Sequence, residues 1–138
     1  MFQVDKDLFI PQNGSLVLES RPLKVSLAAA VAGCVHAWRH ERNLRVHIAV
    51  TGLVLVAALV LRLTPLECAV LALTVGLVLG MEMMNTAIER AVDLASPEYH
   101  ELAKLSKDVA AGGVALASGA SVVVGLLILG AAVWRLYV

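Results

Sequence analysis

Acidic residues recur at helical spacing in the segment 82–93, EMMNTAIERAVD. On a helix that turns about 100° per residue, Glu89 and Asp93 each lie within about 20° of Glu82. Asn85 lies about 60° from the same stripe. The segment follows a long apolar run, and carboxylates at membrane depth usually face a protein interior or a polar cavity. Three of them on one face favour a functional site over a structural ion pair.

The position of each carboxylate along this helix indicates a different chemical task. Carboxylate oxygens suit hard cations such as Mg²⁺, which in turn suits nucleotide phosphates. Phosphoryl transfer needs a base near the acceptor hydroxyl, metal ions that bridge the phosphates, and cations near the developing charge. Glu82 lies nearest the apolar run, where a poorly hydrated carboxylate accepts a proton readily. Glu89 is two turns closer to water, where a charged metal–nucleotide complex could enter, and Asp93 is further out still.

A second charged cluster, HERNLRVH, occupies residues 40–47. Glu41 in this cluster could supply a second metal ligand from another helix. Taken alone, Glu41 is more simply interpreted as one half of a surface ion pair with Arg45, at i,i+4 spacing.

The third charged cluster, YHELAKLSKDVAAGG, occupies residues 99–113. Lys107 and the adjacent Asp108 could contact a nucleotide, since lysine is a common phosphate ligand. A solvated loop and first helical turn explain the same residues equally well. A lone histidine such as His100 is more often structural or exposed than catalytic.

The composition indicates what kind of protein must hold these residues. The chain has 138 residues, of which 59% are hydrophobic and 16% charged, and its mean hydropathy is +0.83. A soluble domain of this size could not bury so much apolar surface, and the same composition argues against disorder. Eleven basic and eleven acidic residues cancel, so no global basic field indicates nucleic-acid binding. The sequence therefore predicts a membrane protein.

Three stretches predict membrane-spanning helices, at about 46–63, 67–93 and 109–134. The uncharged part of the second stretch, 68–81, has 14 residues, whereas a span needs roughly 20. Its helix can cross the membrane only if it continues past Glu82, which carries ionisable residues to membrane depth.

The segment 23–45 predicts an amphipathic helix at the membrane surface, because Leu27, Val31 and Trp38 recur at helical spacing. An ordinary helix packed on the bundle is the alternative interpretation. The predicted fold class is thus an all-α membrane protein with three transmembrane helices plus an N-terminal amphipathic surface helix. The membrane domain is predicted to comprise 22–138, and 1–21 to form an N-terminal extension.

The distribution of basic residues predicts the topology, because positive charges stay on the cytoplasmic side of a membrane. Basic residues concentrate before the first span and between the second and third spans. They are Arg39, Arg42 and Arg45, followed by Arg90, Lys104 and Lys107. The N-terminus is therefore predicted to be cytoplasmic and the C-terminus outside, which places all three charged clusters on the cytoplasmic side.

The charged clusters resemble those of the small prokaryotic integral-membrane lipid kinases, the diacylglycerol kinase and undecaprenol kinase family. The matching strings are ERNLRVH at 41–47, EMMNTAIERAVDL at 82–94 and YHELAKLSKDVAAGG at 99–113. The similarity covers roughly 22–134. It implies a homotrimer with active sites shared between subunits, ATP with Mg²⁺ as phosphoryl donor, and a lipid alcohol in the inner membrane as acceptor.

The resemblance also implies a role for each matching residue. Glu82 is similar to the family's general base, and Asn85 to the polar residue near the acceptor. Glu41 and Glu89 are similar to the metal ligands. The residues that resemble nucleotide contacts are Asp93, Glu98, Tyr99, His100, Lys107 and Asp108. Ala29 departs from the family, which often has an aromatic residue near the nucleotide at this position.

The acceptor lipid is less sharply indicated than the reaction. The strings ERN, NTAIE and KDVAAG resemble undecaprenol kinases, whereas YHEL is closer to diacylglycerol kinases. We expect undecaprenol as the acceptor, with diacylglycerol as the alternative. Two functions from other classes stay open from the residues alone: a small ion or solute transporter, since intramembrane carboxylates also serve such pathways, and a non-catalytic assembly subunit.

Overall fold

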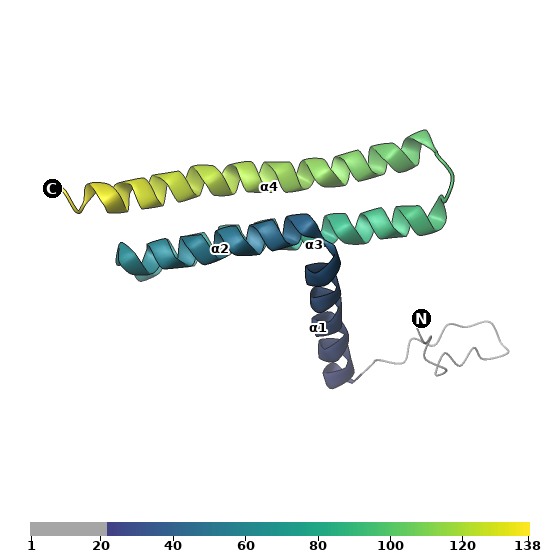
Figure 1. Ribbon diagram of the computed structural model, residues 1–138, viewed down its shortest axis with the longest axis horizontal. Coiled ribbons are helices and arrows are strands. Elements are labelled where there is room, and N and C mark those ends of the chain that lie inside the picture. Colours follow the sequence, from purple (N-terminus) through teal and green to yellow (C-terminus); the bar gives the residue numbers. More distant parts are fainter. Residues whose placement is uncertain (1–21) are drawn as a thin grey trace. The chain divides into compact units, whose positions relative to one another are not determined.

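A computed structural model describes residues 22–138, and the predicted extension 1–21 lies outside the described residues. Four helices make up this part of the chain, which divides into two units. The first unit ends at Gly33 and contains the start of α1 (Leu23–His40). The second unit, Cys34–Val138, contains the rest of α1 and the three long helices (Figure 1).

Helix α1 ends earlier than the sequence predicts. The prediction of one helix over 23–45 is wrong at its C-terminal end, because α1 stops at His40 and α2 (Arg42–Val60) begins two residues later. Glu41 separates them with extended backbone angles, φ −97° and ψ 116°. Near this end of α1, Val35 and Trp38 are 42% and 44% exposed, so apolar side chains are accessible to a membrane surface.

A tight connection joins α2 to α3 (Pro65–Ala95). Arg62 has a left-handed backbone, with φ 50°, and the Leu63 N–H donates to the Ala58 carbonyl at 3.0 Å, which closes the end of α2. Thr64 then caps α3 in a reciprocal arrangement with Glu67, and Pro65 occupies the first turn, where its missing N–H costs nothing. The two helices are therefore forced to reverse direction within a few residues.

Helices α3 and α4 (Glu101–Trp134) lie side by side along most of their lengths (Figure 1). Gly113 lets α4 approach α3 closely, since a Cβ at this glycine would lie 2.6 Å from Met81 Cε. At the end remote from the α3–α4 connection, Arg135 Nη2 donates to Glu67 Oε1 at 2.8 Å. The two helices are thus joined both near their middle and at one end.

The three long helices are each long and apolar enough to cross a membrane, which confirms the three predicted spans. Helix α3 extends beyond its predicted stretch at both ends, whereas α2 begins before residue 46 but ends at Val60, short of the predicted residue 63. Helix α4 begins at Glu101 and not near residue 109, because its first two turns are polar yet helical. Most large apolar side chains of these helices are exposed, as expected for a chain whose solvent is lipid.

Candidate active site

The acidic stripe of Glu82, Glu89 and Asp93 lies on α3, and its side chains become more exposed from Glu82 to Asp93. Glu82 is 3% exposed and Asn85 is 8% exposed, whereas Glu89 is half-buried. The side chain of Asp93 is 65% exposed. Within residues 22–138, Glu82 is the one charged residue that is fully buried. One face of α3 therefore leads from a dry carboxylate to a hydrated one, as the sequence analysis predicts.

Asn85 connects the buried and hydrated parts of this stripe. Its Nδ2 donates a hydrogen bond to Glu89 Oε1 at 2.9 Å. Its Oδ1 is buried without a hydrogen-bond partner in the part of the chain that the structure describes. A buried amide oxygen without a partner is costly and is expected to have one in the working protein. Asn85 thus orients Glu89 and presents a free acceptor beside it.

Glu41 reaches this region from the junction between α1 and α2. It occupies the N-cap position of α2, but its side chain caps nothing there. Its Oε1 accepts a hydrogen bond from Arg90 Nη2 at 2.8 Å, and Arg90 directly follows Glu89 on α3. The alternative pairing of Glu41 with Arg45 is wrong, because the carboxylate turns to α3.

Two further ion pairs lie where α3 ends and α4 begins. Lys107 Nζ on α4 donates to Asp93 Oδ1 on α3. Lys104 Nζ donates to Asp108 Oδ2 at 2.8 Å, one turn along α4. Of the residues predicted to contact a nucleotide, Asp93 and Lys107 are therefore in direct contact with each other, and Asp108 is paired with Lys104.

A pocket of about 300 Å³ opens beside the Asp93–Lys107 pair. Its polar lining residues come from the end of α3, the connection and the start of α4. They are Asp93, Ser96, Glu98, Tyr99, His100, Lys104 and Lys107. Five predicted nucleotide residues share this pocket, which Asp108, Glu41, Glu82, Asn85 and Glu89 do not line.

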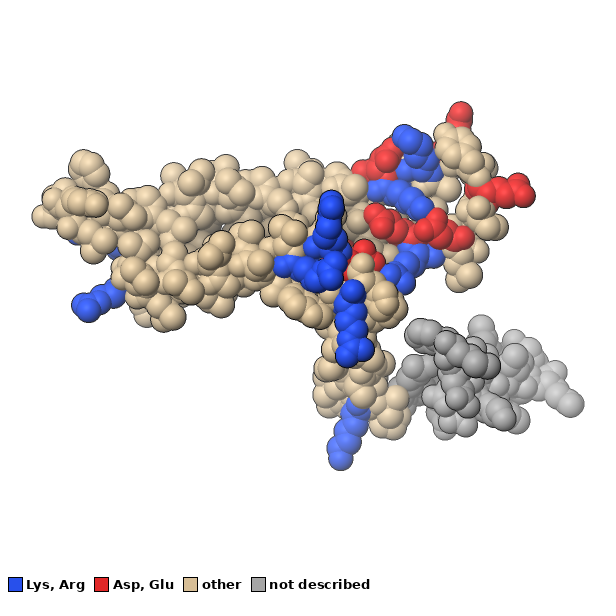
Figure 2. All heavy atoms as spheres, in the orientation of Figure 1, with Lys and Arg blue, Asp and Glu red and all other residues tan. Residues whose placement is uncertain are grey.

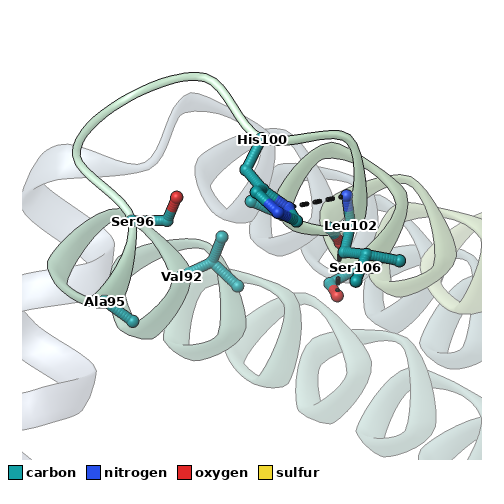
Figure 3. Close-up of a pocket in the computed structure, with 7 residues that line it drawn as sticks. Val92, Ala95, Ser96, His100, Leu102 and Ser106 are labelled. Atoms are coloured by element: carbon teal, nitrogen blue, oxygen red, sulfur yellow. Dashed lines mark hydrogen bonds between the residues drawn. The ribbon is translucent and has the colours of Figure 1, made fainter.

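A second pocket of about 340 Å³ shares one wall with the first (Figure 3). His100 belongs to both pockets and is the N-cap residue of α4, since its Nδ1 accepts a hydrogen bond from the Leu102 N–H at 3.2 Å. This geometry gives His100 a structural task in addition to its predicted contact with the nucleotide. Ser106 also lines the second pocket, but its hydroxyl is held by the Leu102 carbonyl at 2.8 Å.

Acidic and basic side chains of the long helices gather at the end of the bundle that carries this connection (Figure 2). The same view shows further basic side chains part-way along the bundle, where α2 begins, and at the opposite end, with uncharged residues covering the length between them. A site built from charged groups therefore has a place at one end of this bundle, next to the exposed end of the α3 stripe.

The donor set fits a magnesium ion that is shared with a nucleotide. No three His, Cys, Asp or Glu side chains between residues 22 and 138 are grouped so that they could hold a metal unaided. Mg²⁺, however, commonly takes one or two carboxylates, several waters and the substrate's phosphates. The predicted ligands Glu41 and Glu89 offer carboxylate oxygens of this kind, and the unpaired Asn85 Oδ1 offers a neutral oxygen. An oxygen-only set of this kind favours hard cations such as Mg²⁺, Mn²⁺ and Ca²⁺.

The sequence matches a family model, that of the prokaryotic diacylglycerol kinases, over residues 28–129. The chain belongs to this family. The matched region contains every predicted site residue, from Glu41 to Asp108.

Individual relatives within the family carry two different names. A diacylglycerol kinase of Synechocystis sp. is 48% identical over 75% of this chain and 59% of its own length. An undecaprenol kinase of Bacillus subtilis is 40% identical over 65% of this chain and 73% of its own length. A diacylglycerol kinase of Escherichia coli K12 is 32% identical over 67% and 76%, respectively. The chain thus spans less than two thirds of the Synechocystis relative.

Two residues that the structure places beside the candidate site were missed by the sequence analysis. Arg90 was assigned to topology alone, although its position directly after Glu89 was visible. Ser96 lines both pockets and donates to the Glu98 carbonyl at 3.0 Å, which shapes the connection. No spacing rule relates Arg90 to Glu41, which lies 49 residues away.

Proposed function

We propose that this protein is an ATP- and Mg²⁺-dependent lipid kinase that phosphorylates a lipid alcohol at the cytoplasmic face of the inner membrane. The observation that carries the proposal is the graded burial of one face of α3. It runs from buried Glu82, through the Asn85–Glu89 pair, to the hydrated pocket at Asp93 and Lys107. The family match supports the same reaction class.

Glu82 is proposed as the general base. The hydroxyl oxygen of the lipid attacks the γ-phosphorus of ATP, the bond between that phosphorus and the β,γ-bridging oxygen breaks, and ADP leaves. The hydroxyl proton passes to the Glu82 carboxylate. A carboxylate that is 3% exposed is shielded from bulk water, which therefore does not compete with the lipid hydroxyl as its proton donor. Asn85, one turn along, is proposed to orient the hydroxyl.

Glu41 and Glu89 are proposed to hold the metal, and Asn85 fixes the Glu89 carboxylate through its 2.9 Å hydrogen bond. When bound, the divalent ion neutralises charge on the phosphate oxygens. The pocket at the α3–α4 connection is proposed to receive the nucleotide, with Lys107 as its cation. Asp93, Glu98, Tyr99, His100 and Asp108 shape or contact that nucleotide.

The proposed topology places the N-terminus in the cytoplasm and the C-terminus outside. The gathering of charged side chains at the end of the bundle that carries the α3–α4 connection supports this orientation (Figure 2). We further propose a homotrimer with active sites shared between subunits. The extensive exposed apolar faces of the long helices are compatible with packing against further copies as well as against lipid.

Undecaprenol is the acceptor that we propose first. The residues of the strings ERN, NTAIE and KDVAAG and the name of the Bacillus subtilis relative favour it. Diacylglycerol is the second candidate, which the name of the Synechocystis relative favours. Both acceptors present one primary hydroxyl at the membrane surface, so the same base and metal site serve either lipid.

The test is phosphate transfer from labelled ATP by the purified full-length protein in detergent, with undecaprenol, diacylglycerol and ceramide offered separately. We expect Mg²⁺-dependent labelling of one lipid, strongest with undecaprenol. Strongest labelling of diacylglycerol would reassign the acceptor and keep the reaction class. Failure to label any lipid, together with ion or solute flux in proteoliposomes without ATP, would overturn the kinase in favour of the transporter.

A further inference from the structure

Arg90 holds the carboxylate of the proposed metal ligand Glu41. The guanidinium donates at 2.8 Å to a carboxylate that, at the N-cap position of α2, makes no capping bond. Arg90 thus keeps Glu41 turned toward the turn of α3 that carries Glu89. This inference rests on the proposed function, which assigns Glu41 and Glu89 to the metal.

The Arg90–Glu41 pair is suited to exchange and not to holding helices together. The two side chains are 51% and 27% exposed, and ion pairs at such exposure contribute little to stability. A divalent cation carries twice the charge of a guanidinium on a smaller radius, so a carboxylate can leave arginine for the metal at little cost. The structure holds α2 and α3 together through other contacts as well.

Release of Glu41 would free a cation beside the incoming phosphates. Arginine presents five N–H donors in a planar fork that matches phosphate oxygens, and it binds them more specifically than lysine does. Arg90 directly follows Glu89 on α3, so its backbone position is fixed next to the metal site. Sequence neighbours on a helix cannot separate when the ligand arrives.

We propose that Arg90 changes partners on nucleotide binding, from the Glu41 carboxylate to the triphosphate of the metal–nucleotide complex. Without nucleotide, Arg90 competes with the metal for Glu41 and weakens binding of the free ion. With nucleotide, Arg90 contributes a phosphate contact and strengthens binding. The exchange makes metal and nucleotide bind better together than separately.

The bundle offers a matched control at its opposite end. Arg135 donates to Glu67 at the same distance of 2.8 Å, with side-chain exposures of 50% and 20%. This second pair also joins two helices but lies away from the acidic stripe. Substitution R135A therefore removes an equivalent ion pair without touching the proposed site.

The experiment measures two affinities on full-length protein in detergent, with no turnover required. The first is the affinity for Mn²⁺ alone, by electron paramagnetic resonance, since Mn²⁺ prefers the same oxygen ligands as Mg²⁺. The second is the affinity for β,γ-methylene-ATP with Mg²⁺, by calorimetry. The variants are R90A, R90K and the control R135A.

We expect R90A to move the two affinities in opposite directions. Mn²⁺ alone should bind about two- to fivefold more tightly, as loss of an exposed ion-pair competitor allows. The ATP analogue should bind about tenfold more weakly, as loss of one charge-assisted phosphate contact implies. R90K should bind Mn²⁺ as the wild type does and the analogue with intermediate affinity, and R135A should change neither.

Weakening of both affinities by R90A would overturn the exchange and make Arg90 a support for Glu41. Unchanged affinities in R90A, with both ligands bound normally by the wild type, would overturn the exchange and leave the proposed kinase intact. If wild-type protein binds neither Mn²⁺ nor the analogue, the proposed function itself fails, and the exchange fails with it.

Discussion

Replacement of Glu82 by glutamine is the most direct test of the proposed base. Glutamine has nearly the same shape as glutamate but cannot take a proton from the lipid hydroxyl. Loss of a positioned general base lowers a reaction rate by about 10²- to 10⁴-fold. We therefore expect kcat of Glu82→Gln to fall by that factor in the labelled-ATP assay.

The structure also predicts what this substitution leaves unchanged. Glu82 and Glu89 are separated by two helical turns, which is about 10 Å along the helix axis. The KM for Mg-ATP should therefore stay within about twofold of the wild-type value. A raised KM with unchanged kcat would instead report on ground-state binding of the nucleotide. Thermal stability in detergent should not fall, since a neutral amide is cheaper to bury than the charge of a side chain that is 3% exposed.

The matched control is Glu101→Gln, an exposed carboxylate in the first turn of α4. It should keep wild-type kcat and KM. A Glu82→Gln protein that retains kcat within about fivefold would refute the base, because the lower limit of such catalysis is about 10²-fold. A raised KM for Mg-ATP with unchanged kcat would refute it too, and would place Glu82 in nucleotide binding.

Three further substitutions test other parts of the site. Asn85→Ala removes the hydrogen bond to Glu89 and should raise the Mg²⁺ concentration for half-maximal activity about tenfold, as expected for loss of a bond to a charged group; an unchanged Mg²⁺ titration would contradict this role. Gly113→Val should lower the melting temperature in detergent slightly, because the flexible end of the Met81 side chain must move to admit the new Cβ, whereas Gly112→Val meets open space and should change it less. Lys107→Ala should raise the KM for ATP about tenfold through loss of a phosphate contact, and equal KM values in the two proteins would exclude the contact.

The three spans were predictable because hydropathy over roughly 20 residues is a strong local signal. Their ends were not, since a helix continues through polar turns that hydropathy cannot distinguish from loop. Helix α4 therefore starts at Glu101, and its Lys104 and Lys107 stand on a helix face. The break at Glu41 had no glycine or proline to announce it, and a continuous helix over 23–45 was the natural expectation.

The stripe of Glu82, Glu89 and Asp93 was predictable from spacing, because all three lie on one helix whose geometry is known in advance. The partners of these residues came from other helices and could not be read from spacing. Glu41 meets Arg90 across 49 residues, and Lys107 meets Asp93 across 14. His100 as the cap of α4 was also unpredictable, because histidine is not a preferred N-cap residue.

Helix α3 is continuous over 31 residues, from Pro65 to Ala95. The proposed base and the nucleotide pocket therefore stay a fixed distance apart along the helix axis, with about 16 Å of helix rise between Glu82 and Asp93. On the proposed function, an acceptor must therefore bring its hydroxyl to the level of Glu82 along this helix. A bulky headgroup would hold the reacting oxygen at the wrong level.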